Sequence, residues 1–137
     1  MDTIAWWVRG VALLVALCGP AQAKDDEMYK LYGGTYSPDC RNGAAPLVRV
    51  DAKTEALMLE HAGKRMLGQK LQPAYSYFGR SPPPGYEVAL MSDTRGGQLL
   101  FIVYRDKRGL YGKLDGDAKV VAAIGKPLLA PTYRRCP

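Results

Sequence analysis

The side chains that most often carry catalysis are sparse in this chain of 137 residues. His61 is the single histidine, so any mechanism that needs an imidazole must use it. It ends a predicted strand and precedes Ala62 and Gly63, a pair typical of a surface turn. No second histidine or carboxylate stands around it at a spacing typical of metal ligands. We therefore expect His61 to be a turn residue.

The acidic residues offer two further arrangements with chemical potential. Asp115-Gly116-Asp117 clusters carboxylates, which calcium prefers, but the triplet lacks the other oxygen ligands of a calcium loop. A turn followed by a helix N-cap explains both aspartates. Glu55 and Glu60 could form a glycosidase pair, yet odd and even positions of a strand face opposite ways. No serine lies in a G-x-S-x-G or S-x-x-K context. We expect no catalytic residues, no metal and no cofactor.

The most unusual stretch is a loop rich in tyrosine and proline between two predicted strands. Its prolines restrict the chain to extended conformations, so it loses little entropy on docking. Tyrosine and arginine are enriched among the residues that dominate binding energy at interfaces. The stretch is therefore the predicted binding site, although its rings could instead close one end of a barrel. The candidate binding residues are Tyr75, Ser76, Tyr77, Phe78, Arg80, Ser81 and Tyr86.

The N-terminus has the parts of a cleavable export signal. Arg9 precedes an apolar run at 10–18, and Gly19-Pro20 leads to the small-residue sequence Ala-Gln-Ala at 21–23. The run is shorter than the roughly 20 apolar residues of a membrane span. We expect residues 1–23 to be a signal peptide and residues 24–137 to form a single exported domain in the periplasm, with no membrane span left after cleavage.

Two cysteines, Cys40 and Cys136, remain after that cleavage. In an exported domain they are most simply one disulfide, because the C-x-x-C spacing of a redox pair is absent. A ring of that size restrains the unfolded chain by roughly 4–5 kcal/mol. The bridge predicts that the end of the first strand lies beside the C-terminus.

Short strands separated by Gly, Pro and Asp turns predict an all-β, mainly antiparallel fold, a small eight-stranded barrel or sandwich. Apolar residues alternate in several of the strands, as a half-buried strand requires. The predicted strands are Leu31–Ser37, Leu47–Asp51, Ala56–Glu60, Arg65–Gln72, Tyr86–Ser92, Gln98–Arg105, Leu110–Leu114 and Leu128–Arg134. Asp117 as N-cap, an alanine-rich middle and Gly125 predict one short helix before the last strand.

The net charge of +6 could suggest nucleic-acid binding. The basic residues are scattered along the chain, however, and export separates the protein from nucleic acid. A solvated basic surface or an acidic protein partner fits this charge better.

Several elements resemble the periplasmic and membrane-bound inhibitors of C-type lysozyme. They are Val48-Arg49-Val50, Ala56-Leu57 with Gly63 and Leu67, the Ser76, Gly79 and Tyr86 loop, and Gly85-Tyr86-Glu87 leading into Ala89-Leu90. The resemblance implies a disulfide-linked β-barrel that inserts a loop into an enzyme cleft. The compact Ser-Gly-x-x-Tyr motif of that family is absent from the loop.

These observations predict a periplasmic protein-binding module, an inhibitor or immunity protein against a cell-wall-degrading enzyme or toxin, acting through the Tyr75–Tyr86 loop. Two alternatives remain open. One is a lipocalin-like carrier with a small apolar ligand inside the barrel. The other is a minor wall-associated enzyme, which would need His61 or two carboxylates in one cleft.

Overall fold

The computed structural model describes residues 19–137, with side chains from residue 26 onward. Its strands form a closed barrel in which each strand pairs antiparallel with its sequence neighbour and β8 returns to β1. The predicted all-β fold of eight strands is confirmed, as a barrel. The strands are β1 (Gly34–Ser37), β2 (Leu47–Asp51), β3 (Ala56–His61), β4 (Lys64–Ala74), β5 (Tyr86–Thr94), β6 (Gly97–Asp106), β7 (Gly109–Gly116) and β8 (Tyr133–Arg135).

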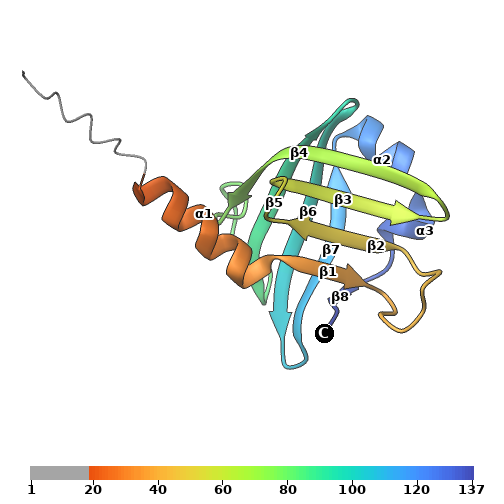
Figure 1. Cartoon of the computed structure of the whole chain (residues 1–137), viewed down its shortest axis with the longest axis horizontal. Coiled ribbons are helices and arrows are strands. Elements are labelled where there is room, and N and C mark those ends of the chain that lie inside the picture. Colours follow the sequence, from red (N-terminus) through yellow and green to blue (C-terminus); the bar gives the residue numbers. More distant parts are fainter. Residues whose placement is uncertain (1–18) are drawn as a thin grey trace, which may run out of the picture.

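In Figure 1 the strands β1 to β4 cross the front of the barrel, and β5, β6 and β7 run behind them at a steep angle. The helix α1 (Gly19–Tyr32) projects at one end, and α2 (Ala118–Ile124) and α3 (Lys126–Leu129) lie at the other. The loop between β4 and β5 lies on the same side as α1 (Figure 1).

Aromatic rings fill part of the barrel interior. Tyr36 of β1, Phe101 of β6 and Tyr133 of β8 have no exposed surface. The ring of Phe101 lies edge-on to both tyrosines, with centroids 4.9 Å from Tyr36 and 6.3 Å from Tyr133. Gly112 of β7 makes room for it, because a Cβ there would overlap the Phe101 ring. Each buried hydroxyl donates to a backbone oxygen at 2.6 Å, Tyr36 to Tyr32 and Tyr133 to Leu128.

The helix α1 corrects the predicted start of the first strand, because Leu31 and Tyr32 belong to the helix and β1 begins at Gly34. Met28 and Tyr32 stand one helical turn apart and are both buried against the barrel. The predicted signal peptide lies mostly outside the described residues, and α1 continues across its cleavage site after Ala23. Cleavage there remains a prediction, and it leaves Met28 and Tyr32 in the mature chain.

The C-terminal segment is a second correction. The predicted strand Leu128–Arg134 is divided into α3 and the three-residue β8. Pro127 stands in the first turn of α3, where a missing backbone donor costs nothing, and Leu128 packs against the core. The predicted helix is confirmed as α2, so the described chain holds three helices instead of the expected one.

Asp117 occupies the N-cap position of α2 without acting as a side-chain cap. Its carboxylate instead accepts the backbone N–H of Gln98 at 2.8 Å, and its own N–H donates to the Gln98 carbonyl at 3.0 Å. Asp117 therefore fixes the start of α2 to the start of β6.

The predicted disulfide between Cys40 and Cys136 is present, with 5.5 Å between the Cα atoms. It joins the loop after β1 to the residue after β8, and the N–H of Cys136 donates to the Thr35 carbonyl at 2.8 Å. The end of the first strand therefore lies beside the C-terminus, as the sequence predicted, and the bridge reinforces the pairing of β1 with β8.

Candidate functional site

The loop between β4 and β5 is tied to the barrel at both ends. The hydroxyl of Tyr86, the first residue of β5, donates to the carbonyl of Ala74, the last residue of β4, at 2.7 Å. Gly85 has φ +81° and its carbonyl accepts the N–H of Arg105 at 2.8 Å. A side chain at Gly85 would meet the Arg105 backbone, so glycine is needed for this close approach. The base of the loop is therefore fixed to the barrel.

The structure places the predicted loop residues in two groups. Tyr77 and Tyr86 are half-buried and in contact, with ring centroids 5.1 Å apart. Tyr75 is 57% exposed and Phe78 is 50% exposed. Ser76, Arg80 and Ser81 are exposed as well. One group therefore packs at the base of the loop and the other is exposed to solvent, and binding through the exposed group stays a prediction.

The tip of the loop has an unusual backbone. Phe78 has φ +48° and Gly79 has φ +73°. A side chain larger than that of asparagine is uncommon in this left-handed region, and the conformation costs about 1 kcal/mol. The N–H groups of Phe78 and Arg80 donate to the Ser76 and Tyr77 carbonyls and hold the turn. The result is that the Phe78 side chain is directed outward on a short, hydrogen-bonded turn.

The loop continues a row of rings across the outside of the barrel. Tyr86 of β5 stands opposite Tyr104 of β6, and Tyr104 stands opposite Tyr111 of β7. The ring centroids of Tyr86 and Tyr104 are 6.2 Å apart, and those of Tyr104 and Tyr111 are 5.3 Å apart and stacked. All are half-buried. We call Tyr77, Tyr86, Tyr104 and Tyr111 the tyrosine row.

A bulge in β5 decides that Tyr86 belongs to this row. Tyr86 pairs with Tyr104, but Val88 pairs with Val103, so Glu87 is an extra residue in β5. In a regular strand Tyr86 and Val88 would share a face. The extra residue leaves Val88 fully buried in the barrel and moves Tyr86 to the outer face.

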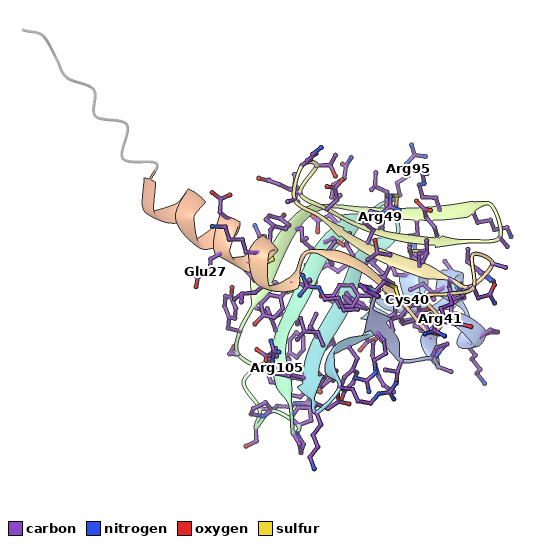
Figure 2. All side chains as sticks on the ribbon, turned by 60° about the horizontal axis from the view of Figure 1, so that its bottom comes forward. Glu27, Cys40, Arg41, Arg49, Arg95 and Arg105 are labelled. Atoms are coloured by element: carbon purple, nitrogen blue, oxygen red, sulfur yellow. A yellow bond between two sulfur atoms is a disulfide. The ribbon has the colours of Figure 1, made fainter. Side chains whose placement is uncertain are left out.

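Glu87, the extra residue, connects three elements. Its carboxylate accepts the Tyr32 hydroxyl of α1 at 3.0 Å and Nε of Arg105 at 2.6 Å. The hydrogen bond from Arg105 lowers the pKa of Glu87, so the carboxylate is charged at neutral pH. Burial and the hydrogen bond that its hydroxyl donates to Glu87 raise the pKa of Tyr32 to about 12. The network fixes α1 beside the base of the loop, and Figure 2 shows Arg105 on that side of the barrel.

The far end of the tyrosine row is closed by Arg134 of β8. Its guanidinium lies 4.7 Å from the centroid of the Tyr111 ring. Both of its terminal nitrogens donate to the Asp106 carboxylate, at 2.8 and 2.6 Å. This bidentate contact lowers the pKa of Asp106 to about 2. A planar cation held on a ring face is a favourable contact and keeps the last tyrosine in place.

The other candidate residues are dispersed. Glu60 pairs with Arg65 at 3.4 Å, while Glu55 lies in the turn before β3, so the two glutamates do not form a couple. Asp115 accepts the N–H of Gly116, and Asp117 is bonded to Gln98. His61 ends β3, beside the turn that the sequence predicted. Within residues 19–137, no group of three or more His, Cys, Asp or Glu side chains could hold a metal ion.

Tyr104, Tyr111 and Arg134 were missed as candidates by sequence reasoning. A signal for the first two was present, because the short turn at 106–109 between the predicted strands Gln98–Arg105 and Leu110–Leu114 fixes the hairpin register. Counting two residues outward on each side of that turn puts Tyr104 opposite Tyr111. No comparable signal placed Arg134 beside them, since its strand was predicted with the wrong bounds.

Comparisons with family profiles, with curated proteins and with solved structures find no match for this chain. In the part of the chain from 19 to 137, no helix has both the length and the apolar character to cross a membrane.

Proposed function

We propose that this chain is an exported protein-binding module, an inhibitor or immunity protein against a cell-wall-degrading enzyme. The observation that carries the proposal is the loop from Tyr75 to Tyr86, which has a fixed base and an exposed tip. A preformed loop loses little conformational entropy when it binds, so more of its contact energy contributes to affinity.

The tyrosine row supports the same proposal. Ring contacts link Tyr77 to Tyr86, Tyr86 to Tyr104 and Tyr104 to Tyr111, so these side chains hold one another in place. Tyrosines ordered in this way present large contact areas at small entropic cost, and they are frequent at interface hot spots. The face available to a partner thus extends from the loop across three strands.

The exposed tip supports the proposed class of partner. Most glycosidases hold two carboxylates across a cleft, about 5–10 Å apart. Phe78 and Arg80 are two residues apart on the exposed turn, one apolar and one cationic. Such a tip suits a sugar-binding cleft lined by rings and carboxylates, with Arg80 beside the acidic pair. The aromatic rings within the barrel weigh against a ligand carrier, since they fill interior volume.

The test is a binding titration of the purified protein against a panel of muramidases and related wall hydrolases, together with their lytic activity. For a hydrolase that binds, Phe78→Ala and Arg80→Ala should each lower the affinity by at least about tenfold. Leu31→Ala is the matched control, because Leu31 of α1 is an apolar side chain of similar exposure, 45%. The proposal fails if no hydrolase binds, or if the loop variants and the control bind equally.

A further inference from the structure

The strand β4 extends beyond its partner β5. Pairing between them begins at Gln69 and Asp93, whereas pairing between β4 and β3 begins at Lys64. Residues 64–68 therefore have a strand on one side only. Their other edge carries backbone N–H and C=O groups that can pair with an added strand.

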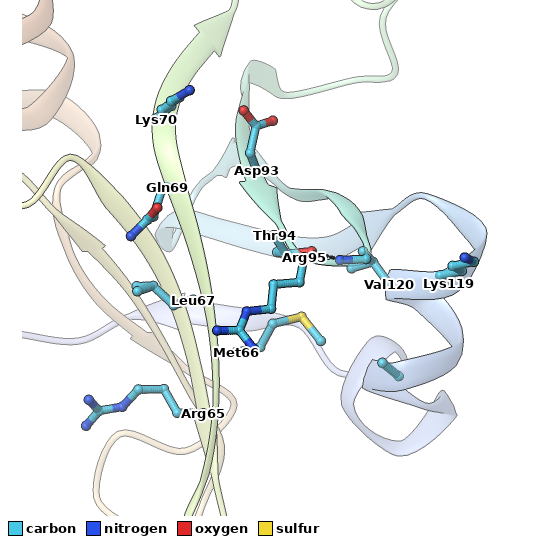
Figure 3. Close-up of a pocket in the computed structure, with 12 residues that line it drawn as sticks. Arg65, Met66, Leu67, Gln69, Lys70, Asp93, Thr94, Arg95, Lys119 and Val120 are labelled. Atoms are coloured by element: carbon cyan, nitrogen blue, oxygen red, sulfur yellow. Dashed lines mark hydrogen bonds between the residues drawn. The ribbon is translucent and has the colours of Figure 1, made fainter.

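A groove of about 710 Å³ runs along that edge. One wall is β4 with Met66, and the opposite wall is the β5–β6 turn with Arg95 and the α2 residues Val120 and Ala123. Figure 3 shows Arg95 directed across the groove toward Met66. A second hollow of about 400 Å³ shares Met66 and Ala123 and continues to Leu128 of α3. The part of the floor that Met66, Ala123 and Leu128 form is thus apolar.

The rim of the groove is basic. Arg65, Lys70, Arg95 and Lys119 surround it with a single carboxylate, Asp93. Arg65 pairs with Glu60, but Lys70, Arg95 and Lys119 form no ion pair with any residue in the described range. These cations disfavour pairing with a second copy of the same edge, because like charges would meet.

We propose that this groove binds an extended acidic segment of a partner protein, which adds to β4 as a strand. Five open residues span about 17 Å at 3.4 Å per residue, enough for a short peptide. Alternate side chains of such a peptide face opposite sides, so one set contacts the apolar floor and the other meets the basic rim. Methionine adapts to varied partners, which suits Met66 at the centre of the floor.

This surface is separate from the tyrosine row, and the inference is independent of the proposed function. Figure 2 shows Arg95, at the groove, and Arg105, which contacts Glu87 beside the loop, at opposite ends of the view. A single molecule can therefore hold an enzyme at one surface and an acidic segment at the other.

The experiment is an NMR titration of the 15N-labelled full chain with a capped seven-residue peptide that alternates glutamate and valine. Binding should shift the amide signals of residues 64–68 and slow the hydrogen exchange of alternate amides there. The double variant Arg95→Ala/Lys119→Ala should weaken binding about three- to tenfold. Lys107→Ala/Lys113→Ala is the matched control, since it removes two exposed positive charges elsewhere. The control and Tyr104→Ala should bind like wild type.

Five outcomes would overturn the inference, and the first four concern the peptides and the variants. They are absence of binding at millimolar peptide, binding without protection of any amide at 64–68, equal weakening by the control variant, and equal binding of the matching lysine–valine peptide. Competition by a short single-stranded oligonucleotide with the affinity of the acidic peptide would also overturn it, because it would identify a general polyanion surface. Loss of hydrolase binding in the loop variants has no bearing on these results.

Discussion

The barrel wall separates two groups of aromatic residues with opposite roles. Inside, Tyr36, Phe101 and Tyr133 have no exposed surface, and both hydroxyls are used by backbone carbonyls. Outside, the tyrosine row is half-buried, and its rings contact one another and the loop. The same residue type stabilises the fold on one face of the sheet and forms a row of ring contacts on the other, which we propose as a surface for recognition. What differs is the amount of water removed from each ring, which sets its contribution to stability.

The largest expected difference in stability is between truncation of Phe101, inside the barrel, and truncation of Phe78, on the exposed loop. Phe101→Ala removes a fully buried ring and should lower the free energy of unfolding by about 3–5 kcal/mol. Phe78→Ala, on the half-exposed ring, should change it by no more than about 0.5 kcal/mol. Urea denaturation followed by circular dichroism measures both. Equal losses would show that the outer ring is structural.

A smaller effect is expected from adding a methyl group beside Phe101. Gly112→Ala forces the ring to move, because the new Cβ would overlap it, and overpacking of this kind costs about 1–3 kcal/mol. Gly43→Ala is the matched control, since nothing lies within 4 Å of a Cβ there. Thermal unfolding of the two variants compares them. A Gly112→Ala protein as stable as the control would contradict tight packing of the interior rings.

Alkaline pH should affect the inner group through ionisation. Burial raises the pKa of Tyr36 and of Tyr133 to about 12, from an unfolded value near 10. The folded chain therefore retains protons that the unfolded chain loses. This contribution to stability is fully present below pH 10 and is lost as the pH rises through about 12. Tyr36→Phe should flatten the fall in urea midpoint between pH 10 and 12, and a slope as steep as that of the wild type would contradict the expectation.

The smallest expected effect concerns coupling within the tyrosine row. A double-mutant cycle on Tyr104→Ala and Tyr111→Ala should give a coupling energy of about 0.5–1.5 kcal/mol, because the two rings are stacked. The Arg134 guanidinium lies over Tyr111 and is expected to retain its contact with Asp106 in the Tyr104 variant. A coupling energy of zero would mean that the row is not organised in solution.

Much of the fold followed from local patterns. Seven of the predicted strands correspond to observed strands within about three residues at each end, and β2 matches at both bounds. Alternation of apolar residues and glycine turns act over a few residues, so they can be read without knowing the partner strand. The eighth prediction, Leu128–Arg134, failed because Pro127 and the leucines after it fit a short helix as well as a strand.

The sequence by itself determined the all-β class, the α2 helix, the disulfide and the position of the exposed loop, because each depends on residue type and near neighbours. Only the tertiary structure decided that α1 packs Met28 and Tyr32 against the barrel. It also decided that the extra residue Glu87 turns Tyr86 outward into the row. A bulge is defined by the pairing of one strand with its neighbour, and a helix face is buried only where another element covers it. Contacts between residues distant in the sequence therefore settled both.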